Sequence, residues 1–178
     1  MKTMTPVISA LLLIVSIISL ESCDLFENGQ KPKTELEKLP PATQEGKNTF
    51  GCLVDGKAWV IKTSIDAQAF YQEGVLSIVA SVNTNNTDQI IAIGLYELNL
   101  SVNEYLLTDY PNNFGRLRDL IDNCEFVTSS SNVGKLKINH LDKTNFIISG
   151  TFEFEAYSSV CDKIVKITHG RFDLNYAP

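Results

Sequence analysis

Residues 146–156 (FIISGTFEFEA) and residues 165–176 (VKITHGRFDLNY) decide the fold. In the first stretch one face is apolar or small and the other is mostly polar. The inward set is Phe146, Ile148, Gly150, Phe152, Phe154 and Ala156. This period of two is typical of a β-strand with one face against a core. The second stretch keeps that period, but its inward positions change from odd numbers (Val165, Ile167) to even ones (Phe172, Leu174, Tyr176).

The change of phase falls at His169-Gly170. A slip of one residue would otherwise turn every later side chain to the opposite face. A β-bulge corrects the phase with one extra residue, so we predict a bulge at His169 and Gly170. Gly170 is expected in the left-handed conformation, which glycine adopts at little cost. With inward residues opposed, the register places Glu153 across from Lys166.

The rest of the chain continues the β pattern. Asp55-Gly56-Lys57 lies between two apolar segments, which predicts a hairpin over residues 50–61. Residues 75–82, 89–98 and 135–140 also read as strands. About eight strands without a βαβ rhythm predict an all-β antiparallel meander, which closes as a barrel-like (calycin-like) domain or packs as a β-sandwich. We favour the barrel, because the strands follow one another as hairpins.

One segment has helical spacing. Phe114, Leu117, Leu120 and Ile121 follow Pro111-Asn112-Asn113, and they predict a short helix over residues 114–121 that caps one end. Residues 65–71 are a weaker helix candidate.

The N-terminus has the pattern of a lipoprotein signal peptide, residues 1–22. Lys2 supplies a positive charge, and an apolar run over residues 7–20 is too short to span a membrane, which takes about 20 residues. Ser22 then precedes Cys23, which we expect to carry the lipid. Glu21 departs from the usual small residue. The alternatives are an ordinary secreted protein and an uncleaved anchor helix.

Residues 23–48 read as a lipidated flexible tether, since they are polar and rich in proline. Residues 49–178 then form a single β domain. The predicted location is the bacterial cell envelope, with the lipid holding the protein to the outer membrane on its periplasmic or surface face.

The chain has four cysteines, Cys23, Cys52, Cys124 and Cys161. If Cys23 carries lipid, the other three allow one disulfide with three pairings, and an exported protein permits it. We favour Cys124–Cys161, because Cys52 sits inside a strand pattern. Three free buried cysteines are the alternative.

Charge and motifs exclude several functions. The formal net charge of −6 argues against nucleic acid as a partner. We predict no catalytic residues, metal site or cofactor, since His140 and His169 are the two histidines and no nucleophile or phosphate motif accompanies them. Glu153 and Glu155 read as a solvated strand face rather than as a glycosidase pair. Trp59 and the tyrosines Tyr71, Tyr96, Tyr105 and Tyr110 read as packing residues, with a sugar or lipid pocket as the alternative.

Three stretches together resemble a family of small Bacteroidota lipoproteins that is catalogued as a domain of unknown function. They are residues 50–59 (FGCLVDGKAW), 148–154 (ISGTFEF) and 167–173 (ITHGRFD), beside the lipoprotein cysteine. Members commonly carry aspartate where His169 stands. The resemblance implies an exported lipoprotein with a β domain, and it supplies no activity or catalytic residues.

Two functions remain as hypotheses. The first is an envelope interaction module that binds an envelope protein or a glycan. The second is a carrier that holds a small apolar ligand inside the barrel. A carrier would leave an open pocket lined by Leu76, Ile91, Ile93, Phe152 and Phe154, whereas an interaction module would bury them against one another.

Overall fold

Eleven β-strands form one continuous sheet in the computed structural model, which describes residues 33–178. The strands are β1 (Thr49–Val54), β2 (Lys57–Val60), β3 (Ala67–Gln72), β4 (Val75–Thr84), β5 (Thr87–Tyr96), β6 (Glu104–Leu107), β7 (Phe114–Asp119), β8 (Cys124–Val127), β9 (Gly134–Asp142), β10 (Ile147–Ser158) and β11 (Lys163–Ala177). Two 3-10 turns, η1 (Leu36–Lys38) and η2 (Ser64–Asp66), are the helical elements of the described part. The prediction of an all-β protein is confirmed.

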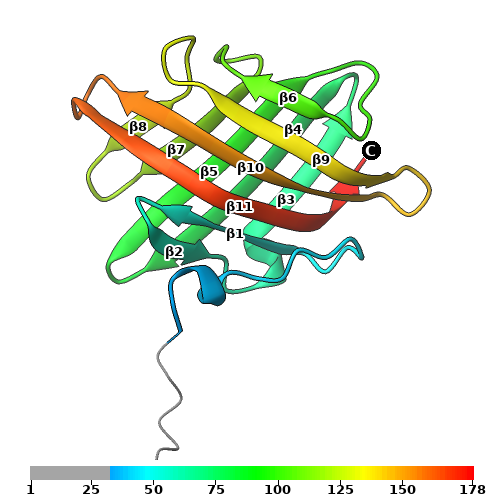
Figure 1. Ribbon diagram of the computed structural model, residues 1–178, viewed down its shortest axis with the longest axis horizontal. Coiled ribbons are helices and arrows are strands. Elements are labelled where there is room, and N and C mark those ends of the chain that lie inside the picture. The colour runs from blue at the N-terminus through cyan, green and yellow to red at the C-terminus, as the bar shows by residue number, and fades with distance from the viewer. Residues whose placement is uncertain (1–32) are drawn as a thin grey trace, which may run out of the picture. The chain divides into compact units, whose positions relative to one another are not determined.

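Seven strands close a ring in the order β11-β3-β4-β5-β7-β8-β10, with β10 pairing back to β11. The hairpin β1–β2 extends the sheet from β11, and β9–β6 extends it from β10. Figure 1 shows the result as two layers, with β9, β10, β11 and β1 crossing in front of β3, β4, β5 and β7. The architecture is therefore barrel-like, as predicted.

The ring closes through its two longest strands. β10 and β11 span 12 and 15 residues, so each reaches from one layer to the other. β10 meets β8 at Tyr157 and Val127. At the other end β11 pairs with β3 in parallel, with Tyr176 beside Ala69. This parallel pair departs from the predicted antiparallel meander, because β11 crosses back to the other layer without a hairpin.

An aromatic cluster fills the middle of the core. The ring of Phe152 lies 5.0 Å from that of Phe50 and 6.4 Å from those of Phe154 and Phe172. Trp59 packs edge-on against Phe50 at 5.9 Å. These rings belong to one continuous hydrophobic cluster with the buried aliphatic residues of β4 and β5.

The predicted helix over residues 114–121 is wrong. Phe114–Asp119 forms β7, which pairs with β5 and β8. The apolar residues were spaced like those of a helix because they come from both faces of a strand. Leu117 points into the core, whereas Phe114 lies on the outside over Gly94. The weaker candidate at 65–71 is also wrong, since residues 67–72 form β3.

The register of β10 and β11 differs from the predicted one by two residues. Glu155, not Glu153, stands opposite Lys166, and the two side chains form an ion pair at 2.8 Å. Glu153 faces Lys135 on β9 instead. A shift of two residues leaves every side chain on its own face, so the hydrophobic pattern cannot distinguish the two registers.

β11 carries one extra residue between Ile167 and Gly170, opposite a single residue of β10. The left-handed residue there is His169, with φ of 53°, rather than Gly170 as predicted. Glycine is needed at 170 for a different reason. A Cβ atom at Gly170 would lie 2.6 Å from three atoms of the Phe152 ring, which packs flat against this backbone.

The folded unit begins earlier than the sequence indicates. Residues 33–48 belong to the same compact unit as the barrel, whereas the predicted tether runs to Asn48. Leu39 is buried, and Pro40 lies against Gly51 of β1. The segment has no apolar periodicity because it contacts the barrel through few side chains and through backbone hydrogen bonds.

The predicted signal peptide, residues 1–22, and Cys23 lie outside the described residues. Within residues 33–178 no helix is both long enough and apolar enough to cross a membrane.

Candidate functional site

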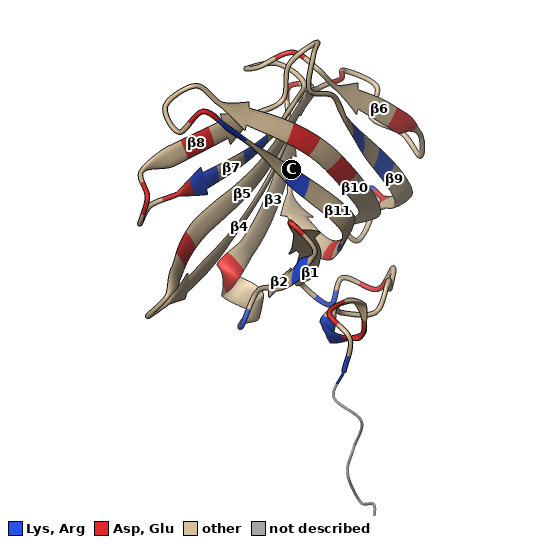
Figure 2. Cartoon of the chain, turned by 60° about the vertical axis from the view of Figure 1, so that its left-hand side comes forward, with Lys and Arg blue, Asp and Glu red and all other residues tan. Residues whose placement is uncertain are grey.

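A groove of about 500 Å³ crosses the outer face of β9, β10 and β11, and we call it the outer groove. Its lining residues are Ala42, Glu104, Lys135, Lys137, Thr151, Phe152, Glu153, His169, Gly170 and Arg171. In Figure 2 the ribbon of β9 is blue at its basic residues and the neighbouring ribbon of β10 is red at its acidic residues. Three cations against two carboxylates give the groove a positive balance, although the whole chain has a net charge of −6.

The strand pairing sets the floor of the groove. Lys137 of β9 and Arg171 of β11 are both register partners of Thr151 on β10. Neighbouring strands lie about 4.8 Å apart, so the two cations stand roughly 10 Å apart with the hydroxyl between them. This row, Lys137–Thr151–Arg171, exists because alternation sends all three side chains outward.

Some charged side chains of the groove form an ion pair and others do not. Lys135 lies 3.8 Å from Glu104. Arg171 donates to the backbone oxygens of Pro40 at 3.3 Å and His169 at 3.5 Å rather than to a carboxylate. Within residues 33–178, neither Lys137 nor Glu153 forms an ion pair. The row therefore presents two cations without a carboxylate partner.

One wall of the groove comes from the N-terminal segment, where Pro40 and Ala42 flank Arg171. Asp173 holds this segment. Its carboxylate accepts hydrogen bonds from the hydroxyl of Thr43 and from the backbone N–H groups of residues 45, 46 and 47, at 2.6–3.2 Å. Asp173 is fully buried. The hydrogen bonds of this single side chain therefore fix the position of the N-terminal segment that forms the wall.

Two opposing effects act on the pKa of Asp173. Burial raises it, because a charged carboxylate loses hydration. The hydrogen bonds from Thr43 and residues 45–47 favour the charged form, and together they outweigh burial and hold the pKa below its ordinary value. Asp173 is therefore a charged group whose four side-chain hydrogen bonds serve to hold the N-terminal segment.

His169 is exposed at the edge of the groove and has a left-handed backbone. This conformation costs a non-glycine residue of order 1 kcal/mol, and such strain often accompanies functional sites. The bulge thus turns one polar side chain toward the groove.

Ser149, His140 and Asp173 lie in one cross-strand row, but they do not form a catalytic triad. Ser149 of β10 pairs with His140 on one side and with Asp173 on the other. A triad needs the imidazole between the acid and the nucleophile. Here the serine is in the middle, and all the hydrogen bonds of Asp173 go to the N-terminal segment.

Asp142 and Glu155 each have a partner within the fold. Asp142, two residues after His140, accepts hydrogen bonds from Thr144 and Asn145 in a turn. Glu155 pairs with Lys166. Among the described residues, no three His, Cys, Asp or Glu side chains gather in a way that could hold a metal ion.

The aromatic candidates fall into two groups. Trp59 is buried, and the hydroxyls of Tyr71 and Tyr105 bond to nearby loop backbone. Tyr96 and Tyr110 are exposed at the end of β5 and beside β7, where Tyr110 packs against Phe114 at 5.0 Å. They line none of the outer groove.

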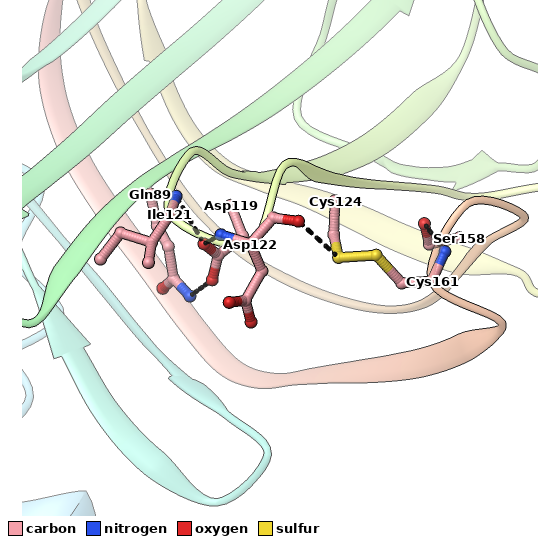
Figure 3. Close-up of a disulfide and its surroundings, with 7 residues drawn as sticks. All are labelled: Gln89, Asp119, Ile121, Asp122, Cys124, Ser158 and Cys161. Carbon is pink, nitrogen blue, oxygen red and sulfur yellow. Dashed lines mark hydrogen bonds between the residues drawn. A yellow bond between two sulfur atoms is a disulfide. The ribbon is translucent and has the colours of Figure 1, made fainter.

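A disulfide joins Cys124, at the start of β8, to Cys161 in the turn between β10 and β11, and Cys52 is a buried free thiol. Figure 3 shows the surroundings of the bridge: the backbone N–H of Cys161 donates to the Ser158 hydroxyl, and the Asp122 carbonyl lies 3.6 Å from the Cys124 sulfur. The bridge lies across the Tyr157–Val127 contact, where the ring closes. It is remote from the outer groove and stabilises the barrel.

Sequence reasoning missed Thr151, Arg171 and Asp173 as site residues. Alternation placed Thr151 on the outer face, but its two cationic neighbours depend on the register and the bulge. The sequence did carry a signal for Asp173, because this acidic residue stands between Phe172 and Leu174 in an apolar strand. A charged side chain in such a buried strand needs hydrogen-bond or ion-pair partners.

A family model described as a domain of unknown function (DUF6252) matches residues 47–173. The match runs from the start of β1 to Asp173, so it includes the floor of the outer groove. No curated protein and no solved structure matches the chain. With most of its length matched, the chain belongs to this family, DUF6252.

Proposed function

We propose that this protein is a lipoprotein of the bacterial cell envelope, anchored through lipid on Cys23 to the outer membrane. Its barrel is an interaction module that binds an envelope protein or a glycan in the outer groove. The anchor is supported by the signal pattern of residues 1–22, by Ser22 before Cys23 and by the resemblance to small Bacteroidota lipoproteins.

The observation that carries the binding role is the contrast between the inside and the outside of the barrel. The five residues that would line a carrier pocket, Leu76, Ile91, Ile93, Phe152 and Phe154, are at most 3 % exposed and share one packed cluster. The outer groove instead offers about 500 Å³, within the usual range of ligand sites. Among the described residues, its Lys137, Glu153 and Arg171 form no ion pair. Binding is therefore proposed outside the barrel rather than within it.

Site-specific photo-crosslinking in living cells tests the binding role. A photoreactive residue at Ala42, an exposed lining residue outside the cationic row, should yield an adduct, and the adduct should be lost when Lys137→Glu is added. Ser77, on the outer face of β4 in the opposite layer, is the matched control position. Equal adducts from both positions, or none from Ala42, would contradict the proposal.

Two further measurements test the anchor and the alternative. Labelling with a radioactive fatty acid should mark the wild-type chain and leave Cys23→Ala unlabelled. Native mass spectrometry of the Cys23→Ser chain should give the bare mass, whereas additional mass that disappears on denaturation would favour the carrier.

A further inference from the structure

The row Lys137–Thr151–Arg171 has the groups that bind an oxyanion. Two cations flank a hydroxyl that can donate, and neither has a carboxylate of the described residues, 33–178, within ion-pair distance. Arg171 is held in place by its bonds to the carbonyls of Pro40 and His169, so its orientation is set before a ligand arrives. Charge-assisted hydrogen bonds to a carboxylate, sulfate or phosphate are stronger than neutral ones.

The surroundings of the row restrict the ligand to an isolated negative charge. Glu104 and Glu153 line the same groove. Glu153 lies two residues after Thr151 on the same face of β10, and it forms no ion pair with the part of the chain that the structure describes. A polyanion, such as an acidic peptide or a nucleic acid, would bring several charges against these carboxylates and against a chain of net charge −6.

The carboxylates are instead suited to accept hydrogen bonds from neutral hydroxyl groups. Glu153 and the His169 ring lie at the same groove as the cationic row, so one ligand can contact both. A sugar ring with a single acidic substituent carries both kinds of group, an oxyanion and several hydroxyl donors, over a short distance.

We propose that the outer groove binds an acidic sugar residue of a glycan, with its single oxyanion group on Lys137, Thr151 and Arg171. Glu153 accepts hydrogen bonds from the neighbouring sugar hydroxyls. This inference rests on the proposed role of the outer groove as the binding surface, and it names the ligand class for that surface.

Titration calorimetry with the Cys23→Ser chain tests the inference. The probes are a disaccharide with one glucuronic acid residue and one neutral sugar, the methyl ester of that disaccharide, glucose 6-sulfate, glucose 6-phosphate and a tetraglutamate peptide. The methyl ester removes the negative charge of the acid and adds one methyl group. Because it cannot form the charge-assisted hydrogen bonds of the carboxylate, we expect it to bind at least about tenfold more weakly than the acid. Affinity for the acid should fall with added salt.

Two lysine variants separate the site from general charge. Lys137→Gln should weaken binding of the acidic disaccharide about tenfold. Lys163→Gln, an exposed lysine at the distant start of β11, removes the same charge and should leave binding unchanged. Both side chains are exposed, so both variants should unfold like the wild type.

Each outcome bears on the inference. Equal binding of acid and ester, or no effect of Lys137→Gln, overturns the oxyanion site. Tighter binding of tetraglutamate overturns the sugar as ligand. The sulfate and phosphate probes identify which oxyanion is preferred. If no acidic sugar binds but the photoreactive residue at position 42 still crosslinks in cells, the ligand class is wrong and the binding role stands; if both fail, both are wrong.

Discussion

The hydroxyl of Thr43 donates a 2.6 Å hydrogen bond to the carboxylate of Asp173, across 130 residues of sequence. Three backbone N–H groups, of residues 45, 46 and 47, complete the shell of this buried carboxylate. Its partners are all neutral, so its charge is stabilised by hydrogen bonds rather than by an ion pair. The same four bonds fix the segment that forms one wall of the outer groove.

Replacing the anchor should release this wall. In Asp173→Asn, an amide NH2 replaces one acceptor oxygen and faces N–H donors, so we expect a loss of about 2–4 kcal/mol in the free energy of unfolding. Urea denaturation measures the loss, and trypsin cleavage after Lys47 should become faster. Asp88→Asn replaces a carboxylate that makes no side-chain hydrogen bond within residues 33–178, and it should change neither measurement. Unchanged stability of Asp173→Asn would contradict the anchor.

The anchor also predicts a pH dependence. Burial acts to raise the pKa of Asp173, but its four hydrogen bonds hold the pKa below the ordinary value. A carboxyl group with a depressed folded pKa contributes stability above its unfolded pKa, about 3.9, and loses it as the pH falls through the folded pKa. The wild type should therefore lose more stability than Asp173→Asn between about pH 6 and about pH 3. Parallel losses, measured by urea midpoints, would show that other carboxylates dominate.

The faces of the strands could be predicted from sequence, but their neighbours could not. Alternation over residues 146–156 correctly separated inward Phe152 from outward Glu153. The partner of Glu153 is set by a two-residue register choice, which leaves the hydrophobic pattern unchanged. The polar row of the groove depends on that choice, so it was visible only in the structure.

The false helix has a similar cause. Gly94 has no side chain, and the ring of Phe114 occupies that space on the outside of the sheet. The half-buried, outward-facing Phe114 then adds to the inward Leu117, and together they imitate a helical spacing. The N-terminal wall was missed for another reason: its contacts run through backbone N–H groups, which leave no trace in the side-chain pattern.

Gly170 tests the packing at the bulge. A Cβ atom would lie 2.6 Å from the Phe152 ring, so Gly170→Ala should lower the free energy of unfolding by about 1–3 kcal/mol. His169→Ala changes the adjacent exposed side chain and keeps the left-handed backbone, so its stability should stay near that of the wild type. A double-mutant cycle should show that Phe152→Leu costs less in the Gly170→Ala background. Additive losses would mean that the methyl group and the ring do not meet.

The disulfide should account for a large part of the stability. Cys124 and Cys161 are separated by 37 residues, and closing a loop of this length stabilises a fold by about 3–4 kcal/mol in the chain-entropy account. The double variant Cys124→Ser, Cys161→Ser should show this loss in urea denaturation. Reductant should lower the stability of the wild type to the same level and leave that of the variant unchanged.

Cys52 supplies an independent check, because it is buried and burial raises the pKa of its thiol. In the Cys23→Ser chain without reductant, a thiol reagent should label no cysteine in the native state and one after denaturation; three labelled thiols would mean that the bridge does not form.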